Sequence, residues 1–356
     1  MTSIERIISI LNHKKTDRIG VDEHFWGDTY SDWSSKGNLK ENYTFPEFFK
    51  LDMDRQWSFN YIADLDFVEK IVDEDEDTYT ALDGNGATLK RHKKHDTTPE
   101  HIAFSVTNRE QWNEIKEKLT PDERRIDFAG YKWVKDLCVR DNRYFNWSGI
   151  NVFEQMHPVC GHENMLMGMA LDPEWIQDMC ETFSNLNISL LETLFSKCGK
   201  PDGAWFYEDM GFKDKPFMSP AMYRELILPY HKKTIDFLHG QGLKVIMHSC
   251  GFVEPLLPHM IEAGIDALQV IEVKAGMDVL RINKNFGDKI ALVGGIDVRA
   301  LYSNDKKIID AELESKIPFL KEKFNYVAHS DHSIPKTVDI ETFQYYLEKV
   351  RKLGTF

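Results

Sequence analysis

From about residue 143 to the C-terminus, short apolar runs alternate with longer amphipathic stretches in a regular order. Apolar residues recur at helical spacing over 173–195, 220–238, 254–263 and 306–324. The apolar runs that separate these stretches read as strands, and they lie at 144–147, 204–207, 244–247, 267–271, 290–293 and 326–328. Strands that alternate with helices in this way form parallel sheets with right-handed crossovers.

Two further candidate strands precede this region, near Ile19 and at 57–61, which gives eight strands in all. Eight βα units close into a barrel, so the predicted fold class is α/β, a (β/α)8 TIM barrel. The segment 66–95 differs, because it alternates with the strand period and contains the turn sequence Asp83-Gly84-Asn85-Gly86. We expect a β-hairpin insertion there. No internal repeat or Gly/Ser linker is visible, so we expect a single domain over 1–356.

The composition excludes several classes of protein. The chain is 42% hydrophobic and 29% charged, which is typical of a folded globular protein. Its net charge is −14, which disfavours binding to nucleic acids or anionic membranes. No apolar window is long enough for a membrane span, and no signal peptide is visible. The five cysteines are odd in number and form no Cys-x-x-Cys, so we expect free thiols and a cytoplasmic location.

Polar side chains follow the later apolar runs at the point where each run ends. The barrel fold places the C-terminal ends of all strands at one rim, where active sites lie. These segments are far apart in the sequence but converge at that rim, which predicts an enzyme active site. They are Glu208-Asp209, His248-Ser-Cys250, Gly294-Gly295-Ile-Asp297 and His329-Ser-Asp331-His332.

His248 and Cys250 form the sharpest pair, because both can reach one metal ion where a strand gives way to a loop. Zinc accepts nitrogen and sulfur ligands, and catalytic zinc has three protein ligands and an open position. His329, Asp331 or His332 could complete the set. The alternative is a packed thiol beside a histidine that is satisfied by the backbone.

The remaining candidates have weaker signals. Glu208 and Asp209 are adjacent, so only one of them can face the barrel mouth, where it could bind metal, orient a ligand or transfer a proton. We take Glu208, Asp209 and His332 as candidate catalytic residues. Gly294 and Gly295, with Asp297, could cradle an anionic cofactor group, although a tight turn is the simpler interpretation.

The chain resembles the uroporphyrinogen decarboxylase superfamily, a barrel family that also contains corrinoid-dependent methyltransferases. The resemblance runs from about Pro201 to the C-terminus. Its signposts are Glu208-Asp209-Met210, Ser219-Pro220-x-x-Tyr223, Leu228-Pro229-Tyr230, His248-Ser-Cys-Gly251, Glu262-Ala-Gly-Ile-Asp266, Gly294-Gly-Ile-Asp297 and His329-Ser-Asp-His332-Ser-Ile-Pro335.

The resemblance favours the methyltransferase branch. Decarboxylases of the superfamily have an arginine-rich segment after the first strand, which holds substrate carboxylates. Here the segment 21–28 is acidic and aromatic, and no arginine lies between Arg18 and Arg55. In the methyltransferases, the His and Cys that match His248 and Cys250 hold zinc together with a later Cys. That later position falls near Asp331, so His329, Asp331 or His332 would have to replace it.

Three functional hypotheses follow. The first is a zinc-dependent methyltransferase that moves a methyl group between a small methylated substrate, as in O-demethylation, or a thiol and a corrinoid (cobalamin) on a partner protein. The second is a metal-free decarboxylase of a tetrapyrrole or a smaller acid. The third is an inactive barrel that serves as a binding module. The sequence leaves the methyl donor, the methyl acceptor and the oligomeric state open.

Overall fold

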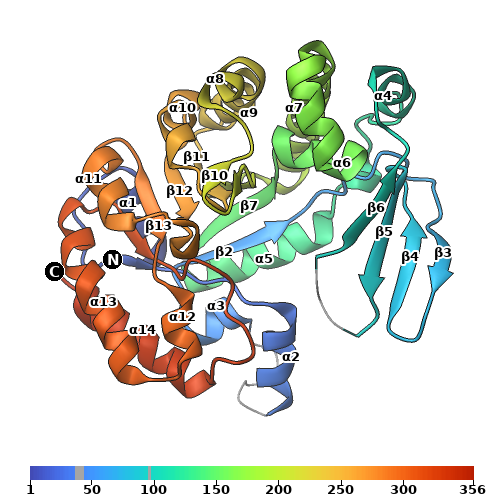
Figure 1. Cartoon of the computed structure of the whole chain (residues 1–356). Coiled ribbons are helices and arrows are strands. Elements are labelled where there is room, and N and C mark those ends of the chain that lie inside the picture. The colour runs from blue at the N-terminus through green and yellow to red at the C-terminus, as the bar shows by residue number, and fades with distance from the viewer. Residues whose placement is uncertain (37–43, 95–97) are drawn as a thin grey trace.

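The computed structural model describes residues 1–36, 44–94 and 98–356, and its centre is a parallel sheet that curls into a barrel (Figure 1). The eight barrel strands follow one another around the sheet in chain order. They are β1 (Gly20–Val21), β2 (Met53–Trp57), β7 (Tyr144–Ile150), β8 (Gly203–Tyr207), β11 (Lys244–Ser249), β12 (Ala267–Val270), β13 (Ala291–Gly294) and β14 (Tyr326–Ala328). This arrangement confirms the predicted (β/α)8 barrel.

Asp52 joins the two ends of the curled sheet. Its backbone N–H donates to the carbonyl of Val21 at 2.8 Å, and its carboxylate accepts the N–H of Val21 at 2.8 Å. This carboxylate is fully buried, and Arg6 and Arg18 neutralise it at 2.8 and 2.6 Å. A buried carboxylate is stable only with such partners, so Arg6 and Arg18 stabilise the junction between β1 and β2.

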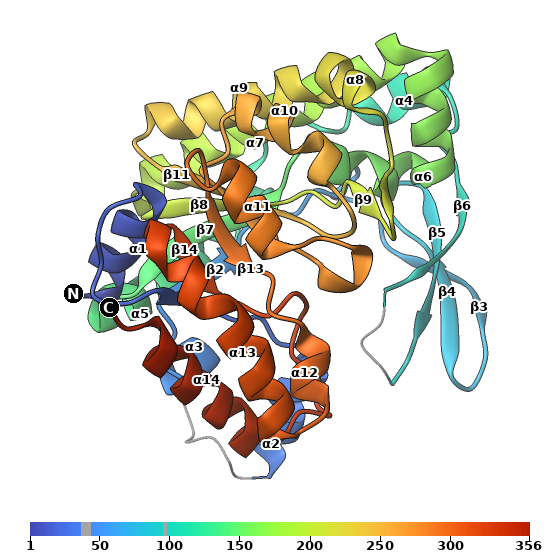
Figure 2. The same ribbon diagram turned by 60° about the vertical axis from the view of Figure 1, so that its left-hand side comes forward.

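Helices cover the outside of the barrel (Figures 1 and 2). Many begin at an N-cap side chain, such as Thr2 with its capping box to Glu5 or Ser219 ahead of Pro220. The longer helices are α1 (Ser3–Leu11), α2 (Gly27–Ser35), α5 (Phe128–Asp141), α6 (Val152–Leu171), α7 (Pro173–Cys198), α9 (Leu228–Gly240), α11 (Val279–Phe286), α13 (Lys306–Leu320) and α14 (Ile340–Gly354). The remaining α-helices are α4 (Arg109–Lys116), which is as long as α11, and the shorter α3 (Phe45–Phe48), α8 (Pro220–Met222), α10 (Leu257–Ala263) and α12 (Val298–Tyr302).

The predicted hairpin is one part of a larger insertion between β2 and β7. Four antiparallel strands form a separate sheet beside α6 (Figure 2): β3 (Lys70–Glu74), β4 (Thr78–Leu82), β5 (Ala87–His92) and β6 (Glu100–Phe104). The expected turn at 83–86 joins β4 to β5. The prediction over 66–95 stopped too early, because a polar stretch hides the weak alternation of β6.

The second barrel strand also differs from its prediction. It spans Met53–Trp57 and not 57–61. Met53 is buried in the barrel interior, but the strand also carries Asp54, Arg55 and Gln56, so it lacks an apolar run. Periodicity therefore assigned the strand to the aromatic residues that follow it.

The barrel interior is filled at the end where the strands begin. Met53, Tyr144, Trp205 and Ile246 pack there against Ile7 and Ile10 of α1. Among the described residues, this apolar plug fills the N-terminal end of the barrel. Among the described residues, no helix is both long and apolar enough to cross a bilayer. All five cysteines are free thiols, whereas the odd count required only one to be free.

Candidate active site

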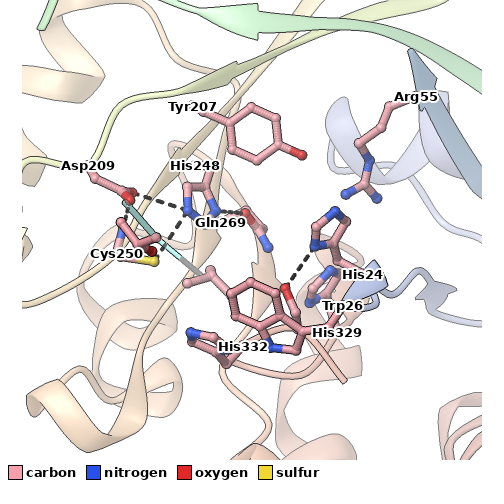
Figure 3. Close-up of a pocket in the computed structure, with 13 residues that line it drawn as sticks. His24, Trp26, Arg55, Tyr207, Asp209, His248, Cys250, Gln269, His329 and His332 are labelled. Carbon is pink, nitrogen blue, oxygen red and sulfur yellow. Dashed lines mark hydrogen bonds and ion pairs between the residues drawn. The ribbon is translucent and has the colours of Figure 1, made fainter. Parts of the chain in front are cut away.

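A pocket of about 260 Å³ lies where the barrel strands end (Figure 3). Its walls come from loops and strand ends that are distant in sequence, as the polar strand ends predicted. They are His24, Trp26, Arg55, Thr98, Tyr207, Asp209, His248, Cys250, Gln269, Val270, His329, His332 and Ser333. Four imidazoles, one thiol, one carboxylate and one guanidinium thus share a single small cavity.

Asp209, His248 and Cys250 converge on one side of this pocket (Figure 3). Nε2 of His248 lies 3.1 Å from Oδ1 of Asp209 and 3.3 Å from Sγ of Cys250. One ligand atom of each residue lies within 4.8 Å of the other two. The structure therefore brings together a nitrogen, a sulfur and an oxygen donor, which are the ligand types that zinc accepts.

The hydrogen bonds around His248 show which position a proton or a metal ion can occupy in this group of donors. Nδ1 of His248 faces Oε1 of Gln269, an acceptor, so Nδ1 carries the proton and donates. Nε2 is then left facing a carboxylate oxygen and a sulfur atom. Burial alone would lower the pKa of His248, but Cys250 and Asp209 raise it well above its ordinary value. Either a proton or a metal ion at this point satisfies all three atoms, so the residues fit zinc.

The loop after β11 is held rigidly around Cys250. The backbone N–H of Cys250 donates to Oδ1 of Asp209 at 2.8 Å. The next N–H, that of Gly251, donates to Oε2 of Glu272 at 2.7 Å. Gly251 has a φ of +76°, and a Cβ there would lie 2.3 Å from the backbone of Gly211. Only glycine fits this position. The thiol is thus placed by backbone contacts and not by a flexible loop.

The opposite wall of the pocket is built from His24, Trp26, His329 and His332 (Figure 3). Nδ1 of His24 lies 2.8 Å from Oγ of Ser333, and the rings of Trp26 and His332 lie 5.6 Å apart. Among the described residues, Nε2 of His329 and Nδ1 of His332 have no hydrogen-bond partner. Burial lowers the pKa of His329 well below its ordinary value, so its imidazole is neutral. Both histidines are in the pocket but outside the three-residue cluster.

The pocket also contains Arg55, which the polar strand ends of the sequence did not predict. It projects from β2, its guanidinium lies 4.0 Å from the centre of the Trp205 ring, and it pairs with the carboxylate of Asp22. Burial raises the pKa of Asp22 to about 7 despite this partner. The alternation of Met53, Asp54 and Arg55 is the signal that could have shown an inward-facing arginine.

The pairing of Asp22 also corrects the argument from the acidic segment 21–28. Asp22 and Glu23 are fully buried, and only His24 and Trp26 of the segment line the pocket. Burial raises the pKa of Glu23 to about 8 although Ser330 and Tyr346 donate hydrogen bonds to it. The segment therefore presents little negative charge to a ligand, and repulsion of carboxylates is not an argument against a decarboxylase.

Glu208 is not at the barrel mouth, contrary to the prediction that made it a candidate catalytic residue. It is fully buried behind the barrel wall and accepts the N–H groups of Phe153 and Glu154 at 3.0 and 3.3 Å. Nε2 of His231 donates to it at 2.8 Å. Adjacent residues at a strand end point in opposite directions. Asp209 faces the pocket, and Glu208 holds the start of α6.

Asp331 does not contribute to the cluster, contrary to its prediction as a metal ligand. Its Oδ2 accepts the N–H of Val273 and its Oδ1 accepts the N–H of Val298, both at 2.8 Å. These bonds tie the loop after β14 to the loops after β12 and β13. Both carboxylate oxygens are occupied, so this residue has a structural role.

Gly294, Gly295 and Asp297 do not line the pocket, so the predicted cofactor cradle is not formed there. Gly294 has a φ of +116°, and a Cβ would lie 2.0 Å from the carbonyl oxygen of Val270. Close strand packing therefore explains this glycine. Asp297 caps α12 by accepting the N–H of Arg299 at 3.0 Å, and it pairs with the side chain of Arg299.

The fold and the pocket define the class of protein: a (β/α)8 barrel with imidazole, thiol and carboxylate groups gathered at its strand ends. The family model described as uroporphyrinogen decarboxylase (URO-D) matches residues 150–353, and the chain belongs to this family. The matched part begins at the end of β7 and includes the whole Asp209, His248 and Cys250 cluster.

Known proteins resemble the chain in sequence over a limited part and in fold over its whole length. The uroporphyrinogen decarboxylases of Geobacter sulfurreducens and Geobacter metallireducens are each 25% identical to it over 146 residues, 38% of this chain. These alignments span only 39% of the length of those relatives. A methyltransferase from Methanosarcina mazei has the same fold, with a TM-score of 0.67 over 99% of both chains at 13% identity.

Proposed function

We propose that the protein is a zinc-dependent methyltransferase that moves a methyl group between a small substrate or a thiol and a corrinoid on a partner protein. The observation that carries this proposal is the convergence of Asp209, His248 and Cys250 in the pocket. The likeness in fold to the Methanosarcina mazei methyltransferase supports the reaction class. A thiolate, an imidazole and a carboxylate together form a donor set that suits zinc.

Asp209, His248 and Cys250 would hold the ion and leave a fourth position open toward the pocket. Bound zinc would supply Lewis acidity, which polarises an ether oxygen or lowers the pKa of a substrate thiol. Burial raises the pKa of the Cys250 thiol, so the protonated His248 and Cys250 must both release protons when a metal binds. The side-chain oxygen of Gln269 accepts the Nδ1 proton of His248 and so fixes the orientation of the imidazole ring.

The rest of the pocket would bind and orient the small substrate. Trp26 provides an apolar wall. Nδ1 of His332 beside it has no hydrogen-bond partner among the described residues and can contact a substrate. Arg55 offers a positive charge at the base of the pocket, partly balanced by Asp22. A volume of about 260 Å³ suits a small molecule.

Metal content and methyl transfer test this proposal together. Protein purified without chelator is expected to contain one tightly held zinc at this pocket, and Cys250→Ala is expected to lose it while remaining folded. Free methylcobalamin and simple thiols then serve as probes, with the cobalt absorption reporting demethylation. We expect turnover by the wild type and at least a hundredfold less by Cys250→Ala. Full metal content and activity in Cys250→Ala would contradict the proposal.

A decarboxylase is the second candidate, and Arg55 is the observation in its favour. A guanidinium inside the pocket is a natural partner for a substrate carboxylate. The sequence likeness to the Geobacter enzymes points the same way. Against a tetrapyrrole substrate stands the small volume of the pocket, together with Arg55 as its sole arginine or lysine among the described lining residues. Release of carbon dioxide from uroporphyrinogen, lost in Arg55→Met but kept in Cys250→Ala, would establish this alternative.

A further inference from the structure

A second group of metal-binding side chains lies outside the pocket, between the inserted sheet and the barrel. His101 belongs to β6, and His157 and His162 belong to α6. One ring nitrogen of each lies within 4.8 Å of those of the other two. None of the three lines the pocket, and the proposed function gives them no role.

A kink in α6 creates this group. Gly161 has a φ of +76°, and Pro158 precedes it within the helix. The kink brings the rings of His157 and His162, five residues apart, to a stacked distance of 4.2 Å. Phe104 of β6 packs into the same bend, where a Cβ on Gly161 would lie 2.5 Å from its ring. The end of β6 is thereby fixed on the kink, with His101 5.9 Å from the ring of His157.

His157 is already oriented as a ligand. Its Nε2 donates to Oε2 of Glu154 at 3.0 Å, which leaves Nδ1 with a free lone pair. That Nδ1 is buried and has no hydrogen-bond partner among the described residues. A carboxylate on the second ring nitrogen is the usual support for a metal-binding histidine. A buried imidazole nitrogen without a partner costs free energy that a bound cation would remove.

We propose that His101, His157 and His162 form a binding site for one divalent transition-metal ion of the zinc type. Imidazole ligands suit zinc, copper and nickel, and three of them leave a position for water. Two nitrogens on one tetrahedral zinc lie about 3.3 Å apart. The three rings are stacked, so they must turn about their χ2 bonds for their lone pairs to converge on one ion. This proposal does not depend on the metal in the pocket.

The ion would tie the inserted sheet to the barrel. Among the described contacts, the insertion reaches the pocket through Thr98, three residues before His101. A metal that joins β6 to α6 would therefore fix the part of the insertion that forms a wall of the pocket. Occupancy of this site would set the position of that wall.

Cobalt(II) titration in a Cys250→Ala background tests the site apart from the pocket. Cobalt occupies zinc sites and is visible by absorption, and a thiolate ligand adds a charge-transfer band. We expect Cys250→Ala to bind one cobalt per chain without that band. Adding His101→Ala should weaken binding at least about tenfold, and Glu154→Gln should weaken it about 10- to 100-fold. His259→Ala is the matched control. His259 also pairs with a carboxylate, Glu262 at 3.2 Å, but belongs to no group of potential metal ligands among the described residues.

Two results would overturn the proposal. One is equal cobalt affinity in Cys250→Ala with and without His101→Ala. The other is amide hydrogen exchange in β5 and β6 that is unchanged by zinc in the Cys250→Ala protein. The expected result is slower exchange with zinc, reversed by chelator and absent in the His101→Ala variant. Circular dichroism of each variant separates loss of the site from loss of the fold.

Discussion

Oδ1 of Asp209 lies 3.1 Å from Nε2 of His248 and accepts the backbone N–H of Cys250 at 2.8 Å. One carboxylate therefore fixes both the imidazole and the thiol of the pocket cluster. Burial alone would raise the pKa of Asp209, but His248 and the Cys250 N–H hold it below its ordinary value. Asp209 is thus ionised and ready to bind a cation at neutral pH.

Asp209→Asn is expected to weaken zinc binding by about 10- to 100-fold. The amide keeps the size of the side chain but removes the negative charge that faces Nε2 of His248. Zinc affinity measured by competition with a chromophoric chelator checks this. Asp297→Asn is the control, because Asp297 caps a rim helix outside the pocket. Equal losses in the two variants would mean that Asp209 has no part in the site.

Gln269→Leu is expected to weaken zinc binding about tenfold without removing a ligand. Gln269 accepts the Nδ1 proton of His248, and leucine leaves the imidazole free to turn. Gln269→Glu should restore the affinity, because a carboxylate accepts the same proton. Isothermal titration of the two variants is the measurement. If leucine and glutamate behave alike, the orienting role of Gln269 is wrong.

The barrel could be predicted from the sequence because its later strands are buried on both faces and read as apolar runs. The strand β2 could not, since it carries Asp54, Arg55 and Gln56 between Met53 and Trp57. An inward-facing charged residue breaks the hydrophobic pattern at the very place where the pocket begins. For the same reason Arg55 was absent from the predicted site.

The convergence of His248 and Cys250 in the pocket could also be predicted, because the two residues are local in sequence. Their partner could not be chosen between Glu208 and Asp209, since alternation alone does not fix which residue faces inward. The position of Asp331 after the last strand predicts a metal ligand. In the structure its two carboxylate oxygens instead accept hydrogen bonds from the backbone N–H groups of two other loops. Competition from unpaired backbone donors is a three-dimensional property, which sequence spacing does not record.

Glu208→Ala is expected to destabilise the protein by about 3–5 kcal/mol. It leaves the N–H groups of Phe153 and Glu154 and the buried ring of His231 without their acceptor. Urea denaturation followed by circular dichroism measures the loss. The neighbouring variant Asp209→Asn should unfold within about 1 kcal/mol of the wild type, because its side chain faces the pocket. The opposite order of stability would contradict the assignment of the two carboxylates.

Glu23→Gln is expected to flatten the pH dependence of stability. Burial raises the pKa of Glu23 from 4.5 to about 8, so between these values the folded protein keeps a proton that the unfolded chain has lost. The free energy of unfolding therefore falls as pH rises through this window, by about 1.4 kcal/mol for each pH unit at most. Glutamine does not titrate, and its oxygen can still accept from Ser330. Urea midpoints from about pH 5 to about pH 8 should decline less in Glu23→Gln than in the wild type.

Glu110→Gln on the exposed surface of α4 serves as the control and should decline like the wild type. Parallel curves for wild type and Glu23→Gln would mean that Glu23 is ionised in the folded protein across this range.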